Sequence, residues 1–422
     1  MPDQLDAKQR LLQAITYLAA TRSYAESTLG ELLRHAGVAR ATFYKYFADK
    51  HACLLAAERY HGERLLKALE QDPADPWSAL ARFTRSNPHA LTILAEIQIA
   101  DEQQLRQHDI TREQLASAMT REDADKLTGT MKDPPPAVLA GAAIRALAME
   151  THQSKPNPDA LTKHIGSWFQ NYVADNPRPQ WRQLGDRTAL EDLQADWPSS
   201  SRGLEILSES KPPTSHSQET QRQSILHAIV DVTHKYGYVR STVSEIAMAA
   251  GVSRGTFYAH FPDKATAFQT AHQTIFGDLM ALCMRNFVKA DEWPDKVWNG
   301  GHMFASFFAK HPMLAKFVFV DSLTSGTVKA KHQLYGYLEA FAVFLEPSGD
   351  AVPARPTSHT SAQLIANAIF ELNYEYVRAG RSRQLTSLLP FATYLILAPS
   401  IGTSEADQFI EQKLSTLGAL TH

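Results

Sequence analysis

The chain has little cysteine and no long apolar run. Cys53 and Cys283 are its only cysteines, and neither has a companion at metal-ligand spacing. This excludes a disulfide framework, and a reducing compartment is expected. Stretches such as residues 391–398 are too short to cross a bilayer, and residues 1–9 lack an apolar signal core. We therefore expect a soluble cytoplasmic protein.

Strong net charge and enzyme motifs are also missing. The 42 basic residues nearly balance 45 acidic ones, for a net charge of −3, so any surface that binds nucleic acid must be local. The sequence has no glycine-rich phosphate loop, nucleophile elbow or metal-spaced cluster. We expect no catalytic residue, no metal and no cofactor. The length of 422 residues predicts two to four domains.

An internal repeat determines the organisation of the chain. Adding 214 to any position in residues 9–50 gives its counterpart without a gap, and 18 of these 42 positions are identical. A weaker match between residues 83–88 and 307–312, at an offset of 224, indicates that each half-chain is one copy. Residues 177–218 hold prolines and a serine run, which are typical of a linker.

The pattern is helical nearly throughout, so we predict an all-α fold. Each repeat divides into three short helices. The second helix opens with a Thr-x-x-Glu capping box, at Thr28 or Thr242, and ends at Gly37 or Gly251, where glycine permits a left-handed turn. The third helix spans residues 39–47 or 253–261. Ser253 is a good N-cap, whereas alanine in the first copy costs about 1 kcal/mol of local stability.

Two helices joined by a short glycine turn form a scaffold that sets the second helix in the DNA major groove. The valine just before each third helix, Val38 or Val252, and the two phenylalanines within the helix have the spacing to face inward, which leaves the polar residues outward for phosphates and base edges. Lysine at the start of a fourth helix suits a phosphate. The predicted DNA contacts are Thr28, Ala39, Arg40, Thr42, Tyr44, Tyr46 and Lys50 in the first copy, and Thr242, Ser253, Arg254, Thr256, Tyr258, His260 and Lys264 in the second.

Residues 252–264, Val-Ser-Arg-Gly-Thr-Phe-Tyr-Ala-His-Phe-Pro-Asp-Lys, closely resemble the signature of the tetracycline-repressor (TetR) family. Residues 38–50 are a weaker version that lacks the serine cap and has lysine at position 45 in place of a small residue. The resemblance covers about 45 residues per copy. It implies two consecutive TetR-like units, each with a three-helix DNA-binding domain and a helical domain for ligand binding and dimerisation. The implied domains are residues 1–50, 51–176, 219–264 and 265–422, with the linker at 177–218.

The resemblance also implies a four-helix bundle between the large domains, with candidate helices at residues 137–152, 158–173, 361–378 and 384–398. A stripe of aromatic and soft side chains in the second large domain is more typical of a core, but as a group it is suited to line a pocket for a small apolar or aromatic effector. These candidate pocket residues are Met303, Phe304, Phe307, Phe308, His311 and Phe317.

Family members normally bind palindromic DNA as homodimers. Since this chain carries both halves, our hypothesis is an intramolecular pseudo-dimer, a repressor that binds an asymmetric inverted repeat on the nucleoid and is released by its effector. Two alternatives stay open: the first DNA-binding domain is degenerate and the chain homodimerises, or the protein is an interaction adaptor. The operator, the effector, the regulated genes and the sign of regulation are not readable from the sequence.

Overall fold

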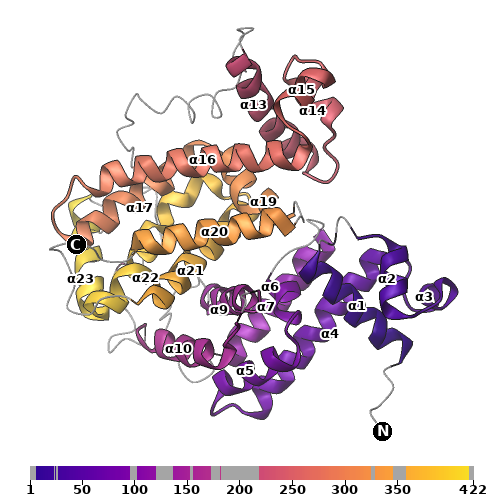
Figure 1. Cartoon of the computed structure of the whole chain (residues 1–422). Coiled ribbons are helices and arrows are strands. Elements are labelled where there is room, and N and C mark those ends of the chain that lie inside the picture. The colour runs from indigo at the N-terminus through magenta and orange to yellow at the C-terminus, as the bar shows by residue number, and fades with distance from the viewer. Residues whose placement is uncertain are drawn as a thin grey trace.

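Figure 1 shows the computed structural model of the chain. The structure describes residues 6–22, 24, 27–95, 102–119, 136–152, 155–172, 181, 218–324, 328–345 and 358–417. Within these ranges the regular elements are helices and no strand occurs, as predicted. The predicted linker, residues 177–218, lies outside the described residues except for Trp181 and Gln218.

Three short helices, which we call the first reader, open the chain. Asp6 caps the first of them by accepting a hydrogen bond from the Gln9 amide at 2.7 Å. Leu11, Ile15 and Phe43 are completely buried in the core of the bundle. The helices are α1 (Ala7–Thr21), α2 (Leu29–Ala36) and α3 (Arg40–Tyr46).

The second reader repeats this arrangement with helices of nearly the same length. It consists of α13 (Gln218–Tyr236), α14 (Val243–Ala249) and α15 (Arg254–His260). Its core is continuous with that of the large domain behind it, whereas the first reader has a core of its own that extends only to α4 and Ile93.

Each reader is followed by a larger helical domain, which we call the first body and the second body. The first body contains α4 (Lys50–Gln71), α5 (Pro76–Ser86), α6 (Ala90–Ala95), α7 (Glu102–Met119), α9 (Pro136–Glu150) and α10 (Pro158–Gln170). The second body contains α16 (Lys264–Phe287), α17 (Trp293–Lys310), α18 (Pro312–Lys316), the π-helix η2 (Phe317–Asp321), α19 (Ser322–Thr324), α20 (Val328–Leu345), α21 (His359–Arg378), the 3-10 helix η3 (Ser382–Leu388), α22 (Leu389–Ile401) and α23 (Thr403–Thr416).

The two bodies pack against each other, and the readers lie apart on one side of the pair (Figure 1). Helix α9 of the first body lies along α21 of the second, and α10 also contacts α21. The Tyr172 hydroxyl donates to the Leu395 carbonyl at 2.9 Å, which joins the end of α10 to α22. The helices of this contact are those that the sequence predicted for a four-helix bundle.

One helical stretch changes the prediction that no run is long enough to cross a bilayer. Residues 382–401 form 20 consecutive helical residues with a mean hydropathy of 1.3, which is long and apolar enough to cross a membrane. Helix α17 followed by α18 and η2 is long and apolar enough only if this bent pair is counted as one span. Within the fold 78% of the 382–401 window is buried. Its apolar side chains are therefore occupied in packing the second body.

Candidate nucleic-acid interface

Capping boxes hold the second helix of each reader in place. The Thr28 hydroxyl accepts from the Glu31 amide at 3.2 Å, and the Glu31 carboxylate accepts from the Thr28 amide at 2.8 Å. Thr242 and Glu245 repeat both bonds at the same distances. The hydrogen bond from the Thr28 backbone lowers the pKa of Glu31, so the carboxylate that closes the box stays charged.

Glycine makes the turn between the second and third helices. Gly37 has a φ of +60° and Gly251 a φ of +66°, in the left-handed region that other residues rarely adopt. The next amide in each copy then donates back to the preceding helix: Val38 to the Leu33 carbonyl at 3.1 Å, and Val252 to the Ala247 carbonyl at 2.9 Å. The turn therefore fixes the angle at which the third helix leaves the second.

The third helices, α3 and α15, have one buried and one exposed face. Phe43 and Phe257 are completely buried, as the sequence predicted, and anchor each helix. Tyr44 and Tyr258 keep 51% and 48% of their surface exposed, and Tyr46 keeps 46%. Arg40 and Arg254 are also exposed, whereas Thr42, Thr256 and His260 are half-buried. The exposed hydroxyl and guanidinium groups offer the donors and acceptors that a DNA groove requires.

The two readers differ at the start of the third helix. The Ser253 hydroxyl accepts from the Thr256 amide at 3.0 Å. Ala39 has nearly the same extended backbone, with φ −69° and ψ 149° against −74° and 159°, but it provides no side-chain cap. The predicted inequality of the caps is therefore present in the folded protein.

Lys50 and Lys264 occupy less open positions than a phosphate contact suggests. The Lys50 ammonium donates to the carbonyls of Tyr24 and Ser27 at 2.7 and 2.6 Å and lies 4.0 Å from the centre of the Tyr24 ring. Lys264 repeats this set with Tyr238 and Ser241. Burial lowers the pKa of both lysines. Each ammonium has three N–H groups, so one at most is left for a phosphate, and that contact stays a prediction.

Local charge is a feature that the search for motifs passed over. Residues 9–50 contain six basic and three acidic side chains, whereas residues 223–264 contain four and three. The exposed Arg34 and Lys45 are replaced by methionine and alanine in the second copy, whereas the loss of Arg10 and Arg22 is balanced by Lys235 and Arg240. Counting charge per repeat, rather than over the whole chain, would have found it.

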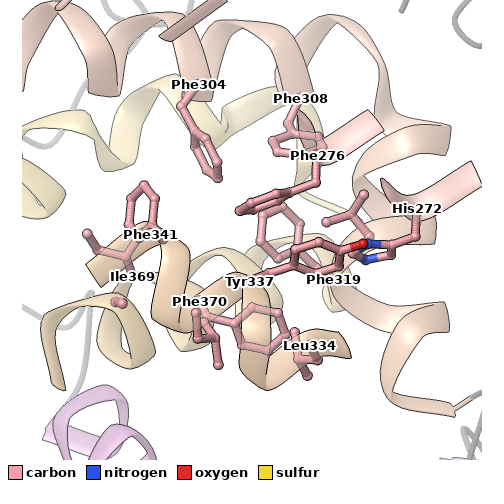
Figure 2. Close-up of a pocket in the computed structure, with 13 residues that line it drawn as sticks. His272, Phe276, Phe304, Phe308, Phe319, Leu334, Tyr337, Phe341, Ile369 and Phe370 are labelled. Atoms are coloured by element: carbon pink, nitrogen blue, oxygen red, sulfur yellow. The ribbon is translucent and has the colours of Figure 1, made fainter. Parts of the chain in front are cut away.

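The second body holds an apolar cavity of about 40 Å³ (Figure 2). Phe304 and Phe308 line it, as the sequence predicted. Four other predicted pocket residues are not among its lining. Of these, Met303 is buried elsewhere, Phe307 packs on His311 with ring centres 4.9 Å apart, and Phe317 packs on Phe268 at 4.4 Å.

Apart from Phe304 and Phe308, the cavity wall comes from four other elements, and the pocket predicted from the sequence included a residue only from one of them, η2. The lining residues of these elements are His272 and Phe276 of α16, Val318 and Phe319 of η2, Leu334, Tyr337, Leu338 and Phe341 of α20, and Ala366, Ile369 and Phe370 of α21. Burial lowers the pKa of His272 to about 4, so its imidazole is neutral at pH 7. The imidazole stacks on the Tyr337 ring with ring centres 4.8 Å apart, at one end of the apolar space (Figure 2).

A second apolar cavity of about 50 Å³ lies next to the first, because Phe304, Phe341 and Ile369 line both. Its remaining wall includes Cys283 and Thr393. Burial raises the pKa of the Cys283 thiol, so it stays protonated and is a poor nucleophile.

A pair of helix-turn-helix units, each with a capped second helix and an exposed third helix, defines the architecture of a DNA-binding protein. Comparison with known proteins agrees. The family model of bacterial regulatory proteins of the tetR family matches residues 11–57 and 225–269. The chain is a TetR-like protein with two tandem units.

Individual relatives match over part of the chain. The HTH-type transcriptional regulator EthR of Mycolicibacterium smegmatis is 34% identical over 89 residues, which cover 19% of this chain. The match spans only 39% of the length of that relative. The solved structure of the fatty acid degradation regulator FadR from Bacillus halodurans matches 42% of this chain and 94% of its own, with 20% identity and a TM-score of 0.36.

Proposed function

We propose that this protein is a sequence-specific DNA-binding transcriptional regulator. The observation that carries the proposal is the pair of readers, each of which presents an exposed arginine and tyrosine on a third helix anchored by a buried phenylalanine. Groups of this kind contact phosphates and base edges. On this proposal the protein acts on the nucleoid in the cytoplasm and has no catalytic activity.

The two halves act as one pseudo-dimer. The contact of α9 and α10 with α21 supports this. It joins the first body to the second body in the way that the two chains of a homodimer would be joined. The readers differ in their caps and in their charge, so the preferred operator is an inverted repeat with unequal half-sites. The resemblance to the TetR family favours repression, and a reporter gene under the operator tests the sign.

Footprinting on the operator tests this proposal, with Arg40→Ala and Arg254→Ala as a matched pair. Both arginines are exposed, so the variants should stay folded. Each variant should weaken one half-site and reduce the slope of log affinity against log salt by about 1 if the arginine contacts a phosphate. Equal half-sites that respond equally to both variants would contradict the asymmetric operator. A response to Arg254→Ala alone would favour the alternative in which the first reader is degenerate.

A small apolar effector that binds the second body is the second part of the proposal. The two adjoining cavities support it, and their 40 and 50 Å³ require side chains to move, because one water molecule already takes about 30 Å³ in the liquid. The π-helix η2 lines the first cavity and also contacts α13 of the second reader. Single π-turns are frequent at functional sites. An effector that displaces Phe319 would therefore move the reader and change its affinity for DNA.

Filling the shared wall tests the effector. Phe304 stands between the cavities, so Phe304→Trp should occupy space that an effector needs, and Phe304→Leu is the control that enlarges it. The probes are benzene and indole in a thermal-shift assay, followed by gel shift. A rise in melting temperature that Phe304→Trp abolishes, with DNA binding retained, is the expected result. Melting temperatures that neither probe changes in any variant would contradict an apolar effector of this size.

A further inference from the structure

Charged side chains are buried where the two bodies meet. The side chains of Arg145 and Glu371 are only 1% and 2% exposed, and they are 226 residues apart in the chain. The Arg145 Nε donates to the Glu371 carboxylate at 2.7 Å. From α7, Arg112 reaches the same carboxylate at 2.8 Å and Glu375 at 2.7 Å. Ion pairs so far from water are costly unless each charge has a partner.

At the buried centre of this cluster the two halves contribute opposite charges, whereas at its edge Arg378 of the second half binds Asp109 of the first half at 2.9 Å. Both arginines that contact Glu371 come from the first half, and Glu371 and Glu375 come from the second. Burial acts to raise the pKa of Glu371, but the two guanidinium groups more than offset this, and the net shift is downward. The carboxylate is therefore ionised, and at the buried centre two arginines of the first half meet a carboxylate of the second.

The internal repeat indicates what a symmetric pairing would look like. Residues 143–147, Ala-Ile-Arg-Ala-Leu, align with residues 368–372, Ala-Ile-Phe-Glu-Leu, at an offset of 225. The counterpart of Arg145 is thus Phe370, and the counterpart of Glu371 is Ala146. In a two-fold dimer every contact occurs twice. Here the positions that would mirror the ion pair are Phe370 and Ala146, which carry no charge, and the Arg145 guanidinium lies 5.0 Å from the centre of the Phe370 ring, its own counterpart in the repeat.

We propose that the buried pair of Arg145 and Glu371 selects the pairing partner, so that a first body binds a second body and rejects a copy of itself. Two first bodies together would bury two Arg145 side chains against alanine. Two second bodies would bury two Glu371 carboxylates against phenylalanine. Both leave buried charges without partners, and such penalties against wrong partners create specificity.

The chain itself supplies the partner. Nine residues beyond Tyr172, the indole of Trp181 donates to the Asp407 carboxylate at 2.8 Å, and its ring lies 5.7 Å from that of Tyr394. Trp181 is buried against α22 and α23 of the second body. Trp181, which follows the first body in the chain, therefore contacts the second body of the same molecule. This inference deepens the proposed pseudo-dimer and does not depend on DNA binding.

Charge reversal in the full-length chain tests the proposal. Light scattering of the unaltered protein should give the mass of one chain, 46.9 kDa. Glu371→Arg and Arg145→Glu should each open the pairing and lower the thermal midpoint by roughly 5 °C or more. Arg82→Glu reverses an ion pair with Asp72 in which both side chains are well exposed, and this control should change neither property.

Rescue separates partner choice from loss of folding. The double variant R145E/E371R should regain the mass of one chain and part of the lost thermal stability, because Arg112, which also contacts position 371, then faces an arginine. Two differently tagged copies, one R145E and one E371R, should co-purify as a two-chain complex when expressed together, because each first body then finds its match on the other chain. Neither tagged variant should co-purify with the unaltered protein.

Three results would overturn the proposal: E371R that stays a single chain with an unchanged midpoint, a double variant no better than the single ones, or tagged copies that do not associate. A two-chain unaltered protein would overturn pairing within one chain. None of these measurements involves DNA, so a protein that pairs as proposed but binds no operator would refute only the regulator.

Discussion

Replacing Ala39 by serine should stabilise the third helix of the first reader. The backbone at Ala39 already has the extended conformation of an N-cap and differs from that of Ser253 by about 10° in ψ. A serine hydroxyl there can accept from the Thr42 amide as Ser253 accepts from Thr256 at 3.0 Å. A serine cap is worth about 1 kcal/mol relative to alanine, which is roughly a fivefold change in the local opening equilibrium.

Hydrogen exchange measures that opening directly. In Ala39→Ser the amides of α3 should exchange roughly fivefold more slowly, and in the matched variant Ser253→Ala those of α15 should exchange roughly fivefold faster. The affinity of the protein for the first DNA half-site should rise by no more than this factor. Only molecules with a folded α3 bind DNA, so the cap raises the affinity only as far as it raises the folded fraction of α3.

The outcome that refutes the reasoning is specific. If Ser253→Ala speeds exchange in α15 while Ala39→Ser leaves α3 unchanged, then the missing cap is not what distinguishes the readers. If neither variant changes exchange, the hydrogen bond at Ser253 does not stabilise its helix.

Further predictions concern the glycine turn, the buried lysine and pH. Gly251→Ala should cost about 1 kcal/mol through backbone strain alone, since no atom lies within 4 Å of the added methyl group, and α15 should exchange faster. Lys264→Met should lower the free energy of unfolding by about 1–3 kcal/mol in a denaturant titration, because two carbonyls lose their donor; a salt slope that also falls by about 1 would instead reveal a phosphate contact. The pKa of His272 is lowered to about 4 from an unfolded value of 6.5, so the stability it contributes is present above pH 6.5 and is lost as pH falls towards 4. Between pH 7 and 5 the free energy of unfolding of the unaltered protein should fall by about 2 kcal/mol relative to that of His272→Leu, measured by chemical denaturation. Glu58 occupies the corresponding position of the first half, and burial raises its pKa to about 8. The stability that Glu58 contributes should therefore be lost as the pH rises from 4.5 through 8, opposite to that of His272. The matched control Glu58→Gln should remove this opposite pH dependence.

Local features of the readers could be predicted from the sequence because their causes are local. A capping box depends on two residues three apart, and both boxes formed at Thr28 and Thr242. A left-handed turn depends on one glycine, and both glycines have positive φ. The inward phenylalanines follow from helical periodicity, which requires no knowledge of what they pack against.

The cavity was predicted only in small part, for the opposite reason. Phe304 and Phe308 belong to a stripe on α17, but the remaining wall comes from α16, η2, α20 and α21. Which face of each helix turns inward depends on how these helices cross one another. Met303 and Phe317 have the same apolar character as the lining residues and still lie outside the wall.

By itself the sequence determined that two helix-turn-helix units exist, where their helices begin and end, and that one unit lacks a cap, because each of these depends on neighbours within a few residues. Only the tertiary structure decided that Lys50 binds the carbonyls of Tyr24 and Ser27, and that Arg145 meets Glu371 across 226 residues. Such contacts require distant segments to be brought together, and a buried charge accepts only the partner that the packing of whole helices places beside it.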